Sequence, residues 1–117
     1  MTSDAAYMPE VPGDLPAGPR PMIAVVDALP GHADELRGAI AELAAAVRRE
    51  PGCVTFIPYA DVGVEGRFHL YEVYRDVAAF QDHLQTAHVH RFFGALARHS
   101  STTAQSLVQL AELAVPG

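Results

Sequence analysis

The chain has 117 residues, half of them apolar and 19% charged, a composition typical of one globular domain with a single core. Fourteen acids against eight bases, all of them Arg, give a formal net charge of -6. This balance leaves no basic stripe for phosphates and argues against nucleic acid as a partner. No segment approaches the roughly 20 apolar residues that span a membrane, so we expect no membrane contact.

The lone cysteine, Cys53, has no partner for an internal disulfide and no Cys-x-x-Cys motif, which favours a small buried residue at the start of a strand. The first residues carry acids where a signal peptide would carry positive charge before an apolar run, so we expect a cytoplasmic protein. Neither a Walker loop nor a G-x-G-x-x-G motif occurs, and we expect neither nucleotide nor flavin.

The N-terminal segment 1–21 contains five prolines and two glycines, a density that excludes a helix or a central strand. It predicts an extended arm, either a floppy tail or a segment that packs on a partner or on the mouth of a pocket. We expect the folded domain over 22–113 and a short tail over 114–117.

The first half of the domain predicts one strand and one helix. The apolar run over 22–29 is typical of a strand buried on both faces, and Pro30-Gly31 ends it. Apolar residues recur at helical spacing over 32–50, with acids in the positive first turn and Arg48 and Arg49 in the negative last turn.

The second half predicts three strands and two short helices. These are strands over 53–60 and 67–75, a helix capped by Asp76 and ending at Leu84, a helix capped by Thr86 and ending at about His99, and a strand over 105–113. The order β-α-β-β-α-β predicts an α+β, ferredoxin-like fold with a four-stranded antiparallel sheet. Its helices cover only one face, so we expect a homodimer whose two sheets pack face to face.

Four short motifs follow one another along this pattern. They are Pro30-Gly31, Glu50-Pro51-Gly52-Cys53, the run F-H-L-Y-E-V-Y over 68–74, and F-x-x-H-L-x-T-x-H-x-x-x-F over 80–92. Through them the chain resembles the antibiotic biosynthesis monooxygenase family over about residues 21–113. The resemblance implies a dimeric α+β barrel with a pocket in each subunit. It also implies oxidation of quinols or polyketide anthrones by O₂ in antibiotic biosynthesis, without metal, flavin or haem.

The same family contains haem-degrading members, which use an Asn, a Trp and a haem-ligating His. This chain contains neither Asn nor Trp, and Phe92 or Phe93 stands where the axial His is expected. We therefore expect no haem and no other cofactor.

Deprotonation of a phenol or anthrone makes it reactive toward O₂, so the site needs a base, donors for the oxyanion and a dry pocket. His83 and His88 are the candidate bases, because imidazole titrates near neutral pH. Strand alternation puts Glu72 and Tyr74 on one face. Glu72 either orients a histidine or an arginine or forms a salt bridge in the dimer. Tyr74 either donates a hydrogen bond to the substrate or is an aromatic core residue.

Candidate substrate contacts are Tyr59, Tyr71, Phe80, Phe92 and Asp27, of which Asp27 has a strand-end cap as its alternative role. We expect no metal, because His88 and His90 are two residues apart on one helix and point about 200° away from each other.

Two alternatives to a monooxygenase stay open. The first is an isomerase or cyclase of the same fold that acts on a small carbonyl compound and turns over without O₂. The second is a non-catalytic dimer that binds a small ligand, whose mark would be a pocket without convergent polar groups.

Overall fold

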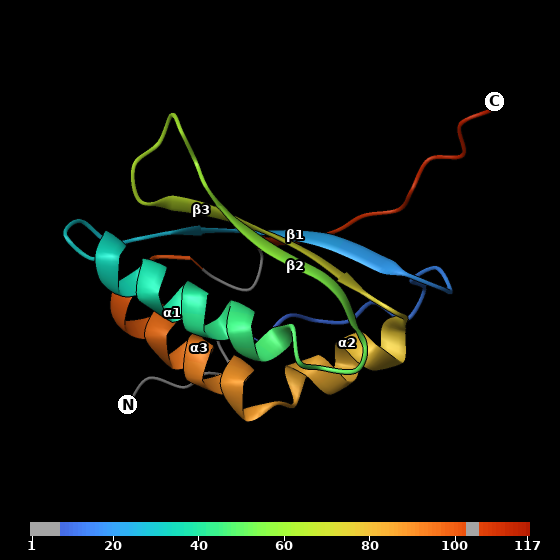
Figure 1. Ribbon diagram of the computed structural model, residues 1–117, viewed down its shortest axis with the longest axis horizontal. Coiled ribbons are helices and arrows are strands. Elements are labelled where there is room, and N and C mark those ends of the chain that lie inside the picture. The colour runs from blue at the N-terminus through green and yellow to red at the C-terminus, as the bar shows by residue number, and fades with distance from the viewer. Residues whose placement is uncertain (1–7, 103–105) are drawn as a thin grey trace.

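The computed structural model describes residues 8–102 and 106–117, which form one antiparallel sheet with helices on a single face (Figure 1). The elements are β1 (Arg20–Asp27), α1 (Ala33–Val47), β2 (Cys53–Ala60), β3 (Arg67–Tyr74), α2 (Val77–Leu84), α3 (Ala87–His99) and β4 (Leu107–Gln109). The four strands lie in the order β2-β3-β1-β4, and all neighbours are antiparallel. The predicted ferredoxin-like α+β fold is confirmed.

Helix α1 packs an apolar stripe into the core but ends three residues earlier than predicted. Its buried residues are Leu36, Ile40, Leu43, Ala44 and Val47. The N–H of Glu50 donates to the carbonyl of Val47 at 2.9 Å, and this turn leads the chain back to the sheet. Arg48 and Arg49 therefore lie beyond the helix, and Nε of Arg48 donates to the carbonyl of Phe56 on β2 at 2.9 Å.

Helices α2 and α3 begin at the two predicted caps. The carboxylate of Asp76 accepts from the N–H of Ala79 at 2.8 Å, and Oγ1 of Thr86 accepts from the N–H of Val89 at 3.3 Å. Such caps satisfy backbone donors that the first turn of a helix leaves free. They fix the point at which the chain bends between the two helices.

Strand β3 shows the alternation that the sequence predicts. The side chains of Phe68, Leu70, Glu72 and Tyr74 are buried on the helix-covered face. Glu72 lies opposite Met22 of β1 and Phe56 of β2, so its carboxyl group stands in the middle of the sheet.

The first and last strands have different bounds from those predicted. Strand β1 begins at Arg20, so Arg20 and Pro21 belong to the sheet and not to the arm. Pro21 lies near the start of the strand, before the residues that pair with β4, and its carbonyl accepts from the N–H of Leu110. The last strand is shorter than the predicted range 105–113, because only three of its residues pair with β1. Gln105 lies outside the described residues.

The described part of the N-terminal arm contains no helix or strand before Arg20. Met8 and Val11 pack against the hydrophobic core. The arm thus lies on its own domain from residue 8 onward. Residues 1–7 are not among the described residues. None of the helices in the described ranges is long and apolar enough to cross a membrane.

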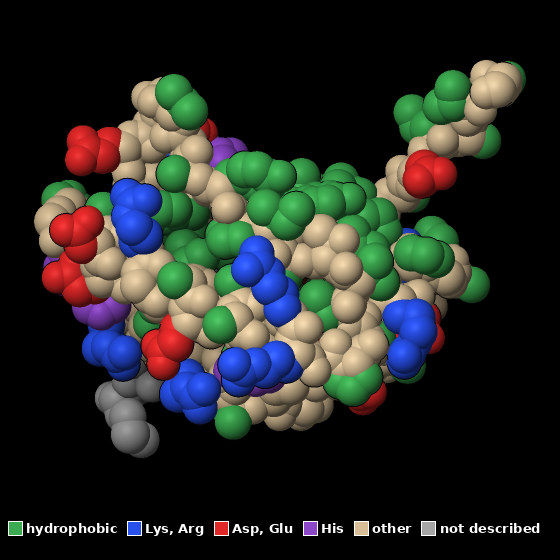
Figure 2. All heavy atoms as spheres, in the orientation of Figure 1, with side chains coloured by type: hydrophobic (Ala, Val, Ile, Leu, Met, Phe, Trp, Pro, Cys, Tyr) green, Lys and Arg blue, Asp and Glu red, His purple; other side chains and the backbone are tan. Residues whose placement is uncertain are grey.

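The face of the sheet away from the helices is open and largely apolar. Figure 2 shows hydrophobic side chains gathered along this side of the molecule. Ile57, Tyr59 and Val108 are 38%, 54% and 51% exposed, values that are high for apolar strand residues. This surface is the one for which the sequence predicts a second copy of the chain.

Candidate active site

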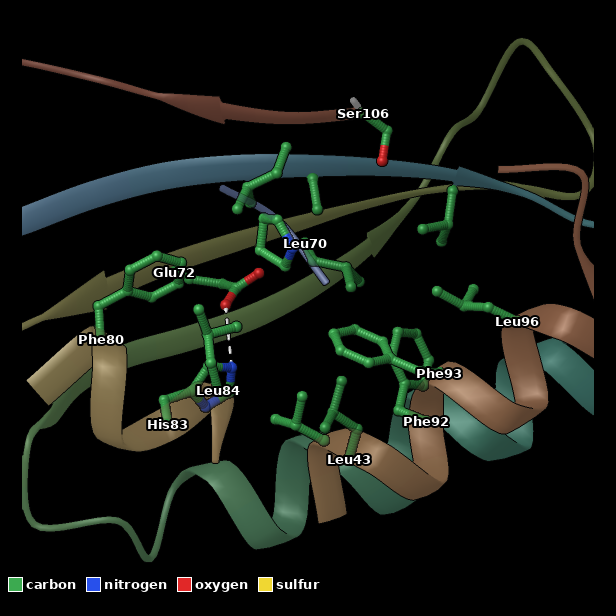
Figure 3. A pocket seen from close by; sticks show the side chains of 15 residues that line it. Leu43, Leu70, Glu72, Phe80, His83, Leu84, Phe92, Phe93, Leu96 and Ser106 are labelled. Carbon is green, nitrogen blue, oxygen red and sulfur yellow. Dashed lines mark ion pairs between the residues drawn. The ribbon is translucent and has the colours of Figure 1, made fainter. Parts of the chain in front are cut away.

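An apolar cavity lies between the helix-covered face of the sheet and the helices (Figure 3). Its wall includes Leu43 of α1, Leu70 of β3, Phe80 of α2, and Phe92, Phe93 and Leu96 of α3. Pro9 of the arm and Leu107 of β4 also line it. The volume of the cavity is about 70 Å³. By the same measure a single water needs about 10–15 Å³. The space therefore accommodates several waters or part of an aromatic ligand.

Two polar side chains converge inside this apolar wall. Glu72 projects from β3 and His83 from the last turn of α2, and Nε2 of His83 lies 3.9 Å from Oε1 of Glu72 (Figure 3). Both side chains are less than a tenth exposed. Ser106 is the third polar residue among the described residues that line the cavity.

The other nitrogen of His83 is held by Glu50, a residue of the turn after α1. Nδ1 of His83 lies 2.8 Å from Oε2 and 3.1 Å from Oε1 of Glu50. A carboxylate accepts hydrogen bonds, so it favours the proton of a neutral imidazole on Nδ1. Nε2 is then left as a proton acceptor on the cavity side, which is the tautomer that a general base needs.

His88 lies on the far side of Glu50 and does not line the cavity. Its Nε2 is 2.5 Å from Oε2 of Glu50. Burial acts to raise the pKa of Glu50, but the hydrogen bonds and charges of His83 and His88 outweigh it and leave this pKa below its usual range. Glu50 is therefore a carboxylate that two imidazoles share.

Glu72 is held from the opposite side by Tyr74, whose hydroxyl donates to Oε1 of Glu72 at 2.6 Å. Burial raises the pKa of Glu72, and the nearby His83 and the Tyr74 hydroxyl offset this only in part. Burial and the charge of Glu72 likewise raise the pKa of Tyr74. The environment thus favours a neutral carboxyl group beside Nε2 of His83.

Gly52 allows the turn that carries Glu50 to pack directly on α2. A Cβ atom at Gly52 would lie 2.4 Å from Cβ of Ala79, closer than carbon atoms approach. The carbonyl of Gly52 also accepts from the N–H of Arg75 at 2.8 Å. The absent side chain at Gly52 is what brings Glu50 within reach of His83.

Residues 21–95 match the model of the antibiotic biosynthesis monooxygenase family. The chain belongs to this family. It is 32% identical to PA3566 from Pseudomonas aeruginosa, with a TM-score of 0.77 over 83% of this chain and 96% of that one. Rv0793 from Mycobacterium tuberculosis shares the fold, with 22% identity and a TM-score of 0.75 over 85% of this chain and 99% of that one.

A 45-residue segment is 40% identical to the uncharacterized protein sll1783 from Synechocystis. This segment is 38% of the present chain but only 31% of that relative. Membership of the antibiotic biosynthesis monooxygenases supports a general monooxygenase-like function.

The motifs that carry the family resemblance also supply the site. Glu50 comes from the motif before β2, Glu72 and Tyr74 from β3, and His83 and His88 from α2 and α3. Phe80 and Phe92, which the sequence predicts as substrate contacts, line the cavity. The structure therefore brings together segments that are up to about 40 residues apart, as the pair Glu50 and His88 shows.

Three predicted contacts lie elsewhere. Tyr59 is 54% exposed, and Tyr71 points to the open face of the sheet because it neighbours the inward-facing Glu72. Asp27 ends β1 in a 2.7 Å ion pair with Arg67, close to its alternative role as a strand-end residue. Tyr74 shares the face of Glu72 as predicted, but it does not line the cavity.

Sequence reasoning missed Glu50, Ser106 and Pro9 as parts of the site. One signal pointed to Glu50, because an acid just beyond the negative end of a helix needs a compensating partner. Glu50, His83 and His88 also offer one ligand atom each, and these atoms lie within 4.8 Å of one another. The sequence argument against metal considered only the histidines and did not include this carboxylate.

Proposed function

We propose that the chain is a cofactor-independent monooxygenase that oxidises a quinol, an anthrone or a related aromatic polyketide intermediate with O₂. The observation that carries the proposal is the position of His83. Its Nδ1 is bound to Glu50, while its side chain lines an apolar cavity beside Glu72. A base with one nitrogen anchored and the other facing an apolar pocket is what phenol deprotonation requires.

The reaction begins when Nε2 of His83 accepts the proton of a phenolic or enolic hydroxyl. Glu50 stabilises the imidazolium that forms, as the carboxylate of a catalytic triad does. The substrate anion passes one electron to O₂, and the radical pair recombines to a hydroperoxide that loses water. One oxygen atom enters the product and the other leaves as water, so the substrate supplies all the electrons and no external reductant is needed.

Glu72 is the donor that fits the negative charge on the substrate oxygen. Its burial favours the neutral carboxyl form, and the Tyr74 hydroxyl holds one of its oxygens in place. A neutral acid in an apolar site can donate a hydrogen bond where a carboxylate could not. Glu72 thus stabilises the oxyanion, and His83 accepts the proton.

An oxygen-electrode assay tests the proposal, with chelator-treated protein and a panel of hydroquinones and anthrones. We expect O₂ uptake that matches the product formed, one to one. Turnover of a panel compound under argon would instead identify an isomerase or cyclase that uses the same base. No O₂ uptake with any compound, at protein concentrations near that of the substrate, would overturn the proposal.

We further infer that the chain acts as a homodimer in which a second copy covers the open face of the sheet. The support is the apolar strand residues Ile57, Tyr59 and Val108, which remain well exposed in the single chain. Exposed apolar surface of this kind is stabilised by association. The dimer would leave the cavity free, because the cavity lies on the other face.

A further inference from the structure

Three segments that are distant in the sequence meet at Glu50. This residue follows α1, His83 lies in the last turn of α2, and His88 is the second residue of α3. Oε2 of Glu50 is 2.8 Å from Nδ1 of His83 and 2.5 Å from Nε2 of His88. All three ligand atoms lie within 4.8 Å of one another.

Two imidazoles and one carboxylate are a ligand set for a first-row transition metal, and zinc sites with three protein ligands commonly use it. Zinc holds such atoms at about 2.0–2.2 Å, so neighbouring ligand atoms in a tetrahedral site are roughly 3.3 Å apart. The Glu50 oxygen would have to move away from each histidine by less than about 1 Å. The two histidine nitrogens lie within 4.8 Å of each other and would move to about the same spacing, so small rotations of all three side chains form the site and leave its fourth position open.

The surroundings keep the three side chains in place and leave a way in. Oγ1 of Thr86 donates to the carbonyl of His83 at 2.8 Å and caps α3, which fixes the bend between the two histidines. Nε2 of His83 faces Glu72 at 3.9 Å, so a carboxyl group lies behind the ligand, as is usual at metal-bound histidines. His88 also lines a groove between α1 and α3, which gives an ion access from solvent.

We propose that Glu50, His83 and His88 bind one divalent transition-metal ion, for which Zn²⁺ is the best-fitting probe. The binding does not depend on the proposed oxidation, but one consequence rests on that function. An ion on Nδ1 of His83 leaves the imidazole proton on Nε2, which turns the proton acceptor into a donor. Zinc would therefore inhibit the monooxygenase by occupying its base.

Isothermal titration of ZnCl₂ into the tag-free, chelator-treated chain tests the site. We expect one ion per chain, and we expect Glu50→Gln and His88→Gln each to weaken binding at least tenfold. His32→Gln is the matched control, because His32 and His99 form another close imidazole pair, with their Nδ1 atoms 2.9 Å apart. Its zinc affinity should equal that of the wild type.

Two further measurements use the unaltered chain and so do not depend on the folding of variants. Zn²⁺ should raise Tm while Mg²⁺ at the same concentration does not. Co²⁺ should give visible absorption bands that Zn²⁺ displaces. The proposal is overturned if the wild type binds no zinc, or if neither Glu50→Gln nor His88→Gln weakens binding. Undiminished monooxygenase activity of zinc-saturated protein would instead overturn the role of His83 as the base.

Discussion

The carboxylate of Glu50 lies 2.8 Å from Nδ1 of His83, although the two residues are 33 positions apart in the chain. This contact joins the turn after α1 to the end of α2 and sets which nitrogen of His83 faces the cavity. His83 is thus held in its orientation by Glu50, which does not line the cavity. Its orientation therefore depends on how the turn after α1 packs against the end of α2, and not on the cavity wall alone.

Replacement of His83 should remove the base while the shape of the site is largely kept. Gln in His83→Gln can still donate to Glu50 but cannot take up a proton at neutral pH. We expect kcat/KM for a panel substrate to fall by about 10²–10⁴-fold, the usual contribution of a general base. Initial rates of O₂ uptake measure the effect.

The control for this variant is His32→Gln, which makes the same chemical change away from the site. His32 precedes the first turn of α1, whereas Glu50, the partner of His83, follows the last turn. It should keep the wild-type rate. Circular dichroism and the elution volume should match the wild type in both variants. A rate in His83→Gln within about threefold of the wild type would remove His83 from the mechanism.

The fold was predictable because its signals are local. The helical spacing, the caps at Asp76 and Thr86, and the alternation along β3 each arise within a few residues. Errors occurred where a partner decides the end of an element. The last strand stops at Gln109 because its pairing with β1 stops there, and α1 stops at Val47 because the next turn must reach β2.

The site was predictable only in part, for a related reason. His83 follows from its place one turn after Phe80 on a buried stripe, and Glu72 follows from the alternation of β3. The partnership of Glu50 with His83 is a contact between segments, and helical or strand periodicity carries no information about it. Alternation already put Tyr71 on the face opposite Glu72, so its exclusion from the cavity could have been read from the sequence.

Gly52→Ala should both destabilise the chain and disturb the site. The new methyl group would lie 2.4 Å from Cβ of Ala79, so either the turn or α2 must shift. Overpacking of this kind costs about 1–3 kcal/mol in the free energy of unfolding. The shift also pulls Glu50 from His83, so we expect kcat to fall while the protein remains folded. Urea denaturation and O₂ uptake measure the two effects.

The matched variant for this test is Gly52→Ala combined with Ala79→Gly. Ala79→Gly alone should destabilise by about 1 kcal/mol, because glycine is a poor helix former. In the double variant the clash is relieved. Its decrease in the free energy of unfolding should therefore be smaller than the sum of the decreases in the two single variants. Strict additivity would show that the close approach of Gly52 to Ala79 does not matter.

The ion pair of Asp27 with Arg67 should make stability fall at acid pH. The hydrogen bond and charge of Arg67 lower the pKa of Asp27 below its ordinary value of 3.8, against a smaller opposing effect of burial. Stability from this lowered pKa is present above the unfolded value and is lost as pH falls through the folded one. The effect should be small, because both side chains are about two-fifths exposed.

Thermal unfolding of wild type and Asp27→Asn between pH 2 and pH 6 checks this sign. The wild type should be the more stable protein at pH 6, and the difference in Tm should shrink toward pH 2. The two proteins must be compared because Asp61 also titrates in the acid range. Its pKa is lowered by its hydrogen bond with His69, and this effect is the same in wild type and Asp27→Asn. A difference that grows toward acid pH would contradict the assignment.

The open face of the sheet gives the last prediction. Ile57 is 38% exposed there and pairs with Tyr71 of β3, so a charge at this position would be buried twice in a symmetric dimer. Ile57→Asp should raise the dimer dissociation constant at least about 100-fold, since each unpaired buried carboxylate costs several kcal/mol. Val62→Asp, a similar change at a fully exposed loop position, should leave it unchanged. Sedimentation equilibrium decides the matter, because a monomeric wild type at micromolar concentration would leave the apolar face without its proposed cover.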